Sequence, residues 1–516
     1  MAETIELSTN TENGYSENLT QFIMEELNLP SEAHFTILKR SIDARRKPIK
    51  ILLRIEFDRK NPIHSIAAPD FPALKSQADT VHIIGAGPAG LFAGLRAIEN
   101  GIKPIIYERG KTVKDRRRDL AKINKEHQVD PDSNYCFGEG GAGTYSDGKL
   151  YTRSKKRGDV RDVLNKLVQF GAPERILYDA HPHIGTNKLP QIIEAIRNTI
   201  TKAGGEVKFQ CKLTDLILEG DQITGIEINH SEKIAATNIV LATGHSARDV
   251  FELLHKKNIE LEFKPFALGV RIEHQQSLID KIQYKAEDRG EFLPPSSYRL
   301  ATQVNGRGVY SFCMCPGGII APCATDQEEV VTNGWSPSKR NNPWSNSGIV
   351  TEVRYNDIPE FHKYGPLAGM EFQKHVEYNC WKIAGESQAV PAQRMIDFTK
   401  GKTSALLADS SYIPGKTSVD LTKILPEFIV TSLQQALVFF GKSMKGFLTN
   451  DAILHAPESR TSSPVRVPRN KETLEHIRIK GLYPCAEGAG YAGGIVSAAI
   501  DGKNCMDAIT NVINEN

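Results

Sequence analysis

The sequence predicts an α/β protein built around a Rossmann-like dinucleotide-binding domain, and two observations carry this prediction. The first is an apolar run at 81–84, the length of a buried strand, followed at once by a G-x-G-x-x-G pattern of glycines. The second is a helical pattern at 91–100, a second apolar run at 103–107, and then the acid Glu108. This order of strand, turn, helix, strand and acid is typical of a dinucleotide-binding βαβ unit.

The residues of this unit suit a bound pyrophosphate and ribose. Gly85 permits a tight turn, Gly87 lets the pyrophosphate approach the backbone, and Gly90 lets the helix pack closely on the strand. The free amides and the positive end of the helix dipole then face the phosphates. We therefore expect the nucleotide to contact the following residues: Gly85, Gly87, Pro88, Ala89, Gly90, Glu108 and Arg109.

Two more segments match the glycine pattern, one starting at Gly138 and one at Gly488. Neither of them follows a clear strand, opens a helix and then leads through a second strand to an acid. Because that context separates a nucleotide site from a glycine-rich turn, we assign the nucleotide to the first match.

Later segments complete a larger pattern. A helix at 189–203 precedes strand-like runs at 206–218 and 222–229, and a strand at 237–241 ends in Ala-Thr-Gly. Near the C-terminus, 481–495 runs from a short strand through glycines into a helix of small residues. This set resembles the FAD-binding fold of the glutathione reductase and p-hydroxybenzoate hydroxylase type.

That resemblance implies FAD as the cofactor and places further residues around it. Glu487 takes the position usually held by an Asp near the ribityl chain and pyrophosphate, and its extra methylene is a departure that allows a water-mediated contact. Amides around Gly493, Gly494 and Ile495 would face the pyrimidine edge of the flavin. The FAD contacts implied in this way are Gly143, Thr144, Ala242, Thr243, Gly244, Glu487, Gly488, Gly493, Gly494 and Ile495.

Four longer motifs bring a closer resemblance that covers nearly the whole chain. They lie at 135–150, 181–186, 311–318 and 458–466, and the third reads Ser-Phe-Cys-Met-Cys-Pro-Gly-Gly. Together they resemble a family of bacterial FAD-dependent dehydrogenases whose substrate is unassigned. The resemblance implies a fold and a cofactor, whereas a function has to be argued from the site itself.

Length and composition allow two or three domains. The 516 residues are 40% apolar and 24% charged, which is enough for separate cores. We expect a small N-terminal α/β domain and linker at 1–75, an FAD-binding domain in two parts at 76–262 and 471–516, and an inserted α+β substrate or cap domain at 263–470. Within the first domain the pattern predicts a strand at 5–7, a helix at 17–27 and strands at 34–42 and 49–57.

Charge and hydropathy exclude some partners. A net charge of +2 gives no general reason to expect nucleic acid or an anionic membrane as partner. Three basic runs, at 45–47, 116–118 and 155–157, are interpreted as solvated faces, and contact with a phosphate or an acidic substrate is the less common alternative. The start of the chain has no apolar core of signal-peptide length, and no later stretch is long enough to span a bilayer, so we expect a cytoplasmic protein.

The cysteine pattern points away from disulfide and metal chemistry. The eight cysteines are scattered through a large chain, which favours free thiols in a reducing compartment. Flavin disulfide reductases carry a C-x4-C pair soon after the fingerprint, whereas this chain has Cys136 alone there. Cys313, Cys315 and Cys323 suggest a redox pair or three metal ligands, but no fourth ligand is in view, so we expect no metal.

Four residues are candidates for catalysis. Lys149 follows a glycine-rich turn, where it would stabilise negative charge on a reduced flavin or simply lie at the surface. His181 and His183 alternate in the sequence and titrate near neutrality, as general acids and bases do, although a structural role is the more common one. Arg460 would grip a substrate carboxylate or phosphate, or pair with Glu458 two residues earlier.

The polar, turn-rich segment at 333–347 is interpreted as a pocket wall, a lid or only a long loop. We conclude that the chain is an FAD-dependent oxidoreductase that moves a hydride between an unidentified small organic substrate and flavin N5. No second nucleotide-binding unit is evident, so the electron donor is either the substrate itself or NAD(P)H bound in the cap cleft. The alternatives are a flavin-dependent RNA-modifying enzyme, a polyprenyl or lipid reductase, and a protein whose FAD is structural or sensory.

Overall fold

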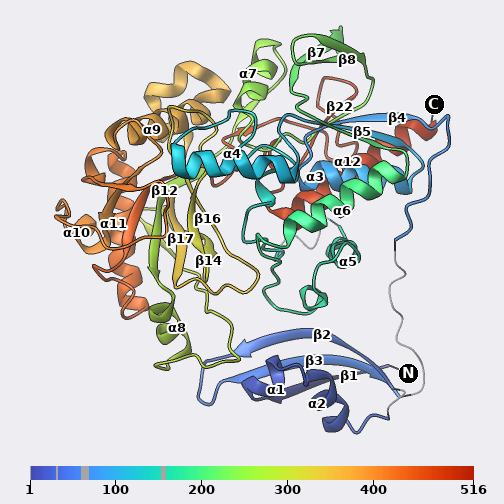
Figure 1. Cartoon of the computed structure of the whole chain (residues 1–516). Helices are drawn as coiled ribbons and strands as arrows, with labels where there is room; N and C mark the ends of the chain where they lie inside the picture. Colours follow the sequence, from blue (N-terminus) through green and yellow to red (C-terminus); the bar gives the residue numbers. More distant parts are fainter. Residues whose placement is uncertain (1, 31–32, 60–68, 153–157, 516) are drawn as a thin grey trace.

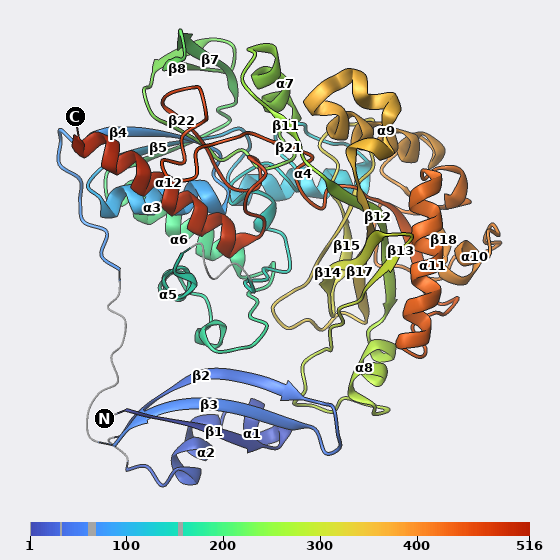
Figure 2. The same cartoon turned by 180° about the vertical axis from the view of Figure 1, so that it is seen from behind.

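The computed structural model describes residues 2–30, 33–59, 69–152 and 158–515, and it confirms the predicted α/β class. A central parallel sheet, a larger mixed sheet and a small N-terminal sheet form three regions, with helices packed on each (Figure 1). The first two regions lie side by side and the N-terminal sheet lies beneath them, as the view from behind also shows (Figure 2). The predicted boundaries at 75, 262 and 470 stay predictions.

The central sheet, which we call the core sheet, contains five parallel strands in the order β22-β10-β4-β5-β6. Its strands span Thr80–Ile84 (β4), Lys103–Glu108 (β5), Glu206–Phe209 (β6), Ile239–Leu241 (β10) and Leu482–Pro484 (β22). The predicted strands of this region are therefore confirmed, except that the run at 206–218 divides into β6 and a separate strand, β7. The strand β22, close to the C-terminus, pairs with β10 and so joins the same sheet as β4 and β5.

Both faces of the core sheet are buried, which explains why its strands read as continuous apolar runs. On one face, Val81, Ile83 and Ile106 pack against the helices α3 (Pro88–Glu99), α6 (Leu189–Lys202) and α12 (Ile495–Glu515), which lie side by side in Figure 2. On the other face, Ile84 and Leu241 pack against a small antiparallel sheet and a helix. Those elements are β7 (Leu213–Glu219), β8 (Gln222–Ile228), β9 (Glu232–Ala235) and α7 (Arg248–Lys256).

The larger sheet, which we call the cap sheet, has seven strands in the order β13-β14-β17-β12-β20-β18-β19. The strands span Phe266–Gln275 (β12), Ala301–Val304 (β13), Arg307–Cys315 (β14), Trp344–Val353 (β17), Val390–Arg394 (β18), Lys416–Ser418 (β19) and Ile453–Glu458 (β20). The helices α9 (Ala368–Ile383) and α11 (Glu427–Ser443) belong to its apolar core. The segment at 333–347 is not one long loop, because it begins in β16 (Thr332–Trp335) and ends in β17.

Shorter elements connect these layers. They are the helices α4 (Val113–Glu126), α5 (Val160–Gln169), α8 (Gln276–Tyr284) and α10 (Met395–Thr399), and the strands β11 (Glu262–Phe263), β15 (Ile319–Pro322) and β21 (Val465–Arg466). None of the helices in the described ranges has the length and hydropathy needed to cross a membrane.

The N-terminal region has the strands and helices that the sequence predicts. Its antiparallel sheet has the order β1-β3-β2, with β1 at Glu3–Thr9, β2 at His34–Asp43 and β3 at Lys50–Asp58, and it carries α1 (Thr11–Tyr15) and α2 (Leu19–Glu26). Arg40 fastens it to the core-sheet region, because its guanidinium donates to Asp179 at 2.8 Å and its backbone bonds to Tyr178 and Ala180. Tyr284 and Leu293 of the cap region join its apolar core. The first half of the expected linker, with Pro62 and Ala67, lies outside the described residues.

Candidate functional site

A cavity of about 300 Å³ opens at the carboxyl ends of strands β4, β5 and β10. Ligands of parallel α/β sheets bind at this edge. The walls come from two regions of the fold, because the cap sheet faces the glycine-rich turns of the core sheet across the cavity. Fifteen residues that the sequence predicts for the site line it: Gly85, Gly87, Pro88, Ala89, Glu108, Arg109, Gly143, Lys149, Ala242, Thr243, Gly244, Arg460, Glu487, Gly494 and Ile495.

The turn between β4 and α3 has the shape that the glycine pattern predicts. Gly87 is the N-cap of α3, and a Cβ added to it would meet no atom within 4 Å, so its open side faces the cavity. A Cβ on Gly90 would lie 1.9 Å from the carbonyl oxygen of Gly85, which leaves no room for a side chain. Gly90 is therefore a packing position and does not line the cavity, whereas Gly87 leaves the backbone open to a ligand.

Glu108 ends β5 with a buried carboxylate that accepts three backbone hydrogen bonds. The amide of Ala86 donates to Oε2 at 2.9 Å, and the amides of Gly110 and Gly138 each donate to Oε1 at 2.9 Å. A carboxylate offers about four acceptor positions, so one remains for a hydroxyl donor of a ligand. Glu108 thus organises the turn and lines the cavity at the same time.

The second glycine pattern packs directly on the first. The amide of Gly140 donates to the carbonyl of Ala86 at 2.8 Å, and a Cβ on Gly141 would lie 3.2 Å from Cα of Gly87. Sequence reasoning set this segment aside because it lacks a strand and helix of its own. Its glycines serve the first turn instead, and Gly143 belongs to the cavity wall. Thr144 does not line the cavity, because it is buried and its hydroxyl donates to the carbonyl of Glu139 at 2.7 Å.

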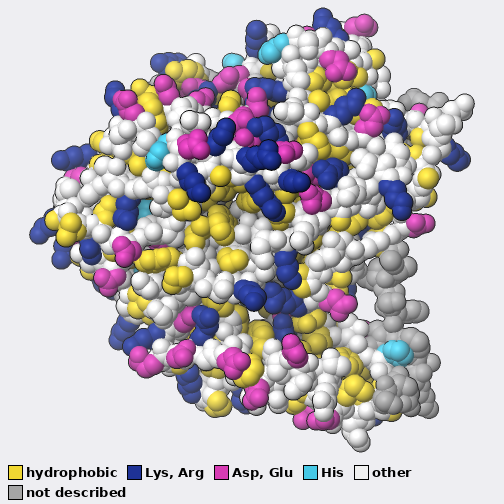
Figure 3. Space-filling model, viewed as in Figure 1, with side chains coloured by type: hydrophobic (Ala, Val, Ile, Leu, Met, Phe, Trp, Pro, Cys, Tyr) yellow, Lys and Arg dark blue, Asp and Glu magenta, His cyan; other side chains and the backbone are white. Residues whose placement is uncertain are grey.

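Arg116 holds this glycine segment in place, and its interpretation as part of a solvated basic run is wrong. Its side chain is fully buried, with Nε donating to the carbonyl of Asn134 at 2.7 Å and Nη1 to that of Gly141 at 3.0 Å. The helical spacing of Val113, Arg116 and Leu120 on the buried face of α4 was the signal that could have found it. The remaining Lys and Arg side chains over α4 lie among Asp and Glu residues (Figure 3). The run at 155–157 lies outside the described residues.

A second helix also begins at the cavity. Gly494, with a φ of +85°, leads into α12, and the first residue of that helix, Ile495, lines the cavity opposite Gly143. The positive ends of α3 and α12 therefore both face the cavity, which suits a ligand with anionic or hydrogen-bond-accepting edges at two places. Gly488 and Gly493 are packing positions outside the wall, as Cβ atoms there would approach Gly244 and Glu487.

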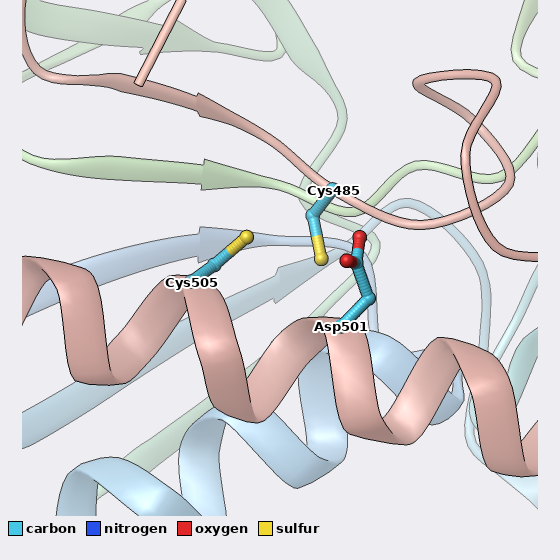
Figure 4. Close-up of side chains that lie close together, drawn as sticks. All are labelled: Cys485, Asp501 and Cys505. Carbon is cyan, nitrogen blue, oxygen red and sulfur yellow. The ribbon is translucent and has the colours of Figure 1, made fainter. Parts of the chain in front are cut away.

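The loop that carries Glu487 is held by a buried group that sequence reasoning missed. Figure 4 shows Cys485 at the end of β22 facing Asp501 and Cys505 on α12, and their possible ligand atoms lie within 4.8 Å of one another. The Asp501 carboxylate accepts the amide of Ala486 at 2.7 Å and the guanidinium of Arg469 at 2.7 Å. That guanidinium already neutralises the carboxylate and would repel a metal cation, so we assign the group a structural role.

Among the four candidates for catalysis, Lys149 lines the cavity and has a charged group whose ion pair is long rather than close. Its Nζ lies 3.7 Å from Cys315 Sγ and 3.8 Å from Asp147 Oδ2, while Asp147 is itself paired with Arg340 at 2.6 Å. Burial disfavours the ammonium, but Cys315 and Asp147 outweigh it and raise the pKa of Lys149 above its usual value. Lys149 therefore carries a positive charge into the cavity at neutral pH.

The two histidines lie outside the cavity wall. His183 places Nε2 3.2 Å from the carbonyl oxygen of Ser338, and burial together with Arg340 lowers its pKa to about 4. It is therefore neutral at physiological pH, and its Nε2–H donates to that carbonyl. His181 is exposed and packs on Tyr151 with the ring centroids 5.5 Å apart. Partial desolvation by its neighbours and the positive charge of Arg340 also lower the pKa of His181.

Arg460 lines the cavity but its guanidinium is already paired. It contacts Glu329 at 2.5 Å and Glu377 at 3.1 Å, and the same two carboxylates pair with Arg248 of α7. All four side chains are buried, so they form a charged cluster between the two large regions. The alternative that Arg460 pairs with Glu458 is wrong, because Glu458 binds Arg271 at 2.7 Å.

Arg109 is paired in a similar way, since its guanidinium contacts Asp132 at 2.6 Å and Asp249 at 2.9 Å and covers the ring of Phe137. The cap side of the cavity adds residues that sequence reasoning did not assign to the site. They are Phe312, Cys313, Cys315, Asn333, Gly334 and Thr461. Asn333 and Gly334 belong to the segment interpreted as a pocket wall, lid or loop, and the structure makes them part of the wall.

Comparisons with known proteins agree with the cofactor that this geometry suits. A family model described as "FAD-dependent protein, C-terminal domain-like" matches residues 265–461, and a domain of unknown function (DUF8436) matches residues 1–58. The chain is an FAD-dependent flavoprotein of an oxidoreductase-like family. An uncharacterized protein of Clostridium beijerinckii is 39% identical over 515 residues, which is 95% of each chain, and our chain belongs to the family of that protein.

Other likenesses are partial. Digeranylgeranylglycerophospholipid reductase 2 of Methanococcoides burtonii is 27% identical over 167 residues, 31% of this chain and 35% of that enzyme. A geranylgeranyl bacteriochlorophyll reductase-like protein of Thermoplasma acidophilum is 13% identical with a TM-score of 0.35, covering 85% of this chain and 80% of that one. CtdE in complex with FAD is 10% identical with a TM-score of 0.33, covering 84% of each chain. TM-scores this low do not establish a shared overall fold.

The residues around the cavity fit FAD. Gly87 leaves the backbone open where a Cβ would otherwise stand, Glu108 keeps one acceptor position, and the amino-terminal ends of α3 and α12 face the same space. Gly85, Gly87 and Glu108 would hold the pyrophosphate and ribose. Gly494 and Ile495 would hold the flavin end, with Lys149 close to it.

Proposed function

We propose that the protein is an oxidoreductase whose substrate is a small organic molecule that binds between the cofactor and the cap sheet. The observation that carries this proposal is the shared wall of the cavity. Residues of the core-sheet region that suit FAD and residues of the cap sheet that have no part in holding a nucleotide line one continuous space. A structural or sensory FAD would not need a second wall of polar and reactive side chains.

When bound, FAD would supply hydride transfer at its N5 atom, and the chain's own residues would set the conditions around it. Lys149 brings a positive charge to a space enclosed by the apolar Phe312 and the backbone of Gly334. In such a partly desolvated site a fixed charge stabilises developing negative charge more strongly than water does. Lys149 would therefore favour the reduced, anionic state of a bound flavin or an oxyanion on the substrate.

The other candidate functions find less support in the site. Lys149, Asn333 and Thr461 lie in the cavity wall beside Phe312, and they offer a polar group of a small substrate partners that a polyprenyl chain would leave unused. A nucleic-acid substrate would need a continuous basic face, whereas Arg116 is buried and the net charge of the chain is only +2.

The proposal is tested by the visible spectrum of the purified protein and by anaerobic addition of NADH or NADPH. We expect the purified protein to show a flavin spectrum and to release FAD on denaturation. Either NADH or NADPH then bleaches the flavin rapidly, or the flavin stays oxidised until its own reduced substrate is added. Rapid bleaching directs the search to electron acceptors, and a stable oxidised flavin directs it to reduced organic donors. A chain that takes up no FAD after reconstitution would refute the proposal.

A further inference from the structure

Strand β14 is irregular where it passes the cavity. Its ladder with β17 shifts register between Phe312 and Cys315, which is the geometry of a β-bulge. Inside the bulge, Cys313 has a φ of +44°, a region that non-glycine residues rarely occupy. Bulges re-aim a side chain out of the regular alternation of a strand, so this one sets the direction of Cys313.

The bulge brings the Cys313 side chain to the cavity. All eight cysteines lie within the described ranges, and Cys313 is the exposed one among them, while Cys315 and Cys323 are buried. Cys313 and Lys149 line the same cavity, and Lys149 Nζ lies 3.7 Å from Cys315 Sγ two residues further along β14. A thiol and an ammonium thus face the same enclosed space.

A buried ion pair holds the bulge in this form. The Arg271 guanidinium, fully buried and bound to Glu458, donates to the carbonyl of Cys313 at 3.4 Å, and the Cys315 thiol donates to the same carbonyl at 3.2 Å. The unusual backbone is therefore supported by residues behind the strand. Such supported irregularity is common where a side chain has to be presented to a ligand.

From this geometry we propose that Cys313 exchanges a proton with the substrate and that Lys149 holds a carbonyl or carboxylate oxygen of the same molecule. This proposal rests on the proposed function and adds a substrate class to it. The substrate would have a carbon–carbon bond next to a carbonyl or carboxylate group, because the pair offers a proton to carbon and a positive charge to oxygen.

The atoms and electrons balance as follows when a double bond is reduced. Bound reduced FAD would supply the two electrons of the reduction as a hydride to one carbon, where a C–H bond replaces the π bond of the substrate. The S–H bond of Cys313 breaks, its proton forms a C–H bond at the neighbouring carbon, and the electron pair of the S–H bond stays on sulfur as a thiolate. The ammonium of Lys149 balances that charge, and the oxidation of a saturated substrate is the reverse.

The ionisation of Cys313 suits a proton donor more than a nucleophile. Partial desolvation inside the cavity raises the pKa of Cys313 to about 11, although the neighbouring Lys149 lowers it. Because the thiolate is the nucleophilic form, a thiol that keeps its proton at neutral pH acts as an acid. The effect of Lys149 on the pKa of Cys313 can also be measured, because removing the positive charge of Lys149 should raise that pKa further.

The test is alkylation of the full-length apoprotein by iodoacetamide and by the anionic iodoacetate, with each cysteine followed by peptide mass spectrometry. We expect Cys313 to react faster than the buried Cys380 and Cys505, its rate still to rise above pH 9, and iodoacetate to be favoured there relative to Cys211. Lys149→Met should slow Cys313 alkylation at pH 9 at least threefold and remove the preference for iodoacetate. The matched control, Lys122→Met on the exposed face of α4, should change neither.

Three outcomes would overturn the proposal. A Cys313 rate that levels off below pH 8 would indicate a nucleophilic thiolate, and a rate no higher than that of the buried Cys380 or Cys505 would mean that the thiol does not face the cavity. An unchanged rate of Cys313 alkylation in Lys149→Met would show that Lys149 does not act on the Cys313 thiol. FAD binding is read separately from the visible spectrum of the reconstituted protein and of Cys313→Ala, so a failure of the proposed function is distinguishable from a failure of this inference.

Discussion

The backbone amide of Gly138 donates a hydrogen bond of 2.9 Å to the carboxylate of Glu108, and this bond joins the end of β5 to a glycine-rich segment thirty positions further along the chain. The acid at the end of β5 therefore has two tasks. It organises the turn at Ala86 and the crossing segment at Gly138, and it keeps one acceptor position toward the cavity.

Replacing this acid should weaken cofactor binding. In Glu108→Gln the side-chain amide presents N–H groups to backbone N–H donors, so at least one buried donor loses its acceptor. Hydrogen bonds to charged groups contribute about 1.5–3 kcal/mol, which predicts FAD binding at least about tenfold weaker. Quenching of FAD fluorescence during titration with apoprotein measures this. Glu206→Gln on the neighbouring strand, with a partly exposed side chain, is the matched control, and an equal loss in both variants would contradict the assignment.

Two alanine substitutions in one turn should have opposite effects. Gly87→Ala adds a Cβ where the structure is open, so the apoprotein should keep its stability while FAD binding is lost. Gly90→Ala adds a Cβ that would lie 1.9 Å from the Gly85 carbonyl oxygen, so it should destabilise the apoprotein itself. Overpacking of this kind costs about 1–3 kcal/mol. Urea denaturation and FAD titration of both variants measure the difference, and a Gly87→Ala protein that binds FAD normally would place the pyrophosphate elsewhere.

Lys149 should tune the reduction potential of bound FAD. Its positive charge favours the reduced, anionic flavin, so Lys149→Met should lower the two-electron potential by roughly 30 mV, which corresponds to about 1.4 kcal/mol. Dye-coupled reductive titration of the reconstituted protein measures the potential. Lys122→Met, on the exposed face of α4, serves as control, and a potential that stays the same in Lys149→Met would move Lys149 away from the flavin.

The buried charged cluster should matter for stability. Glu377 pairs with both Arg248 and Arg460, so Glu377→Gln leaves two buried guanidinium groups with one carboxylate between them. Breaking a buried ion pair from one side costs about 3–5 kcal/mol. We expect a loss of that order in urea denaturation, against little change for Glu371→Gln, whose carboxylate pairs with the partly exposed Lys374 on the same helix. Similar losses of unfolding free energy in both variants would show that the buried cluster stabilises the protein no more than a surface ion pair does.

Acid should destabilise the protein through buried neutral histidines. His274 is buried, its Nε2–H donates to the carbonyl of Phe447, and burial lowers its pKa to about 4 from the usual 6.5. Between pH 6.5 and 4 the unfolded chain binds more protons at this residue, so its contribution to stability, on the order of 3 kcal/mol, is present above pH 6.5 and is lost as pH falls through 4.

Urea denaturation at pH 7 and at pH 4.5 measures this pH dependence. His274→Gln should lose less stability between the two values than the wild type does. His230→Gln, whose side chain is 81% exposed, should lose as much as the wild type. If the wild type and His274→Gln lose the same amount, the acid sensitivity comes from other groups.

The sequence by itself determined the fold class, the βαβ unit and the nucleotide turn. These features depend on local patterns, because an apolar run, spaced glycines and a helical period bring their own backbone geometry wherever the rest of the chain lies. Gly85, Gly87 and Glu108 could therefore be placed from neighbouring residues alone. Family resemblance extended this to the later FAD segments, including Gly494 and Ile495, which line the cavity.

Only the tertiary structure decided which charges are free and which are already paired. Arg460 and Arg109 look like ligand-binding residues in the sequence, yet carboxylates from distant segments neutralise both, whereas Lys149 keeps its charge in the cavity. The bulge that places Cys313 in the same cavity wall as Lys149 likewise depends on Arg271 and Glu458, far from it in the chain. Charge pairing and strand register are set by long-range contacts, and a local sequence pattern carries no information about the partner that folding will bring.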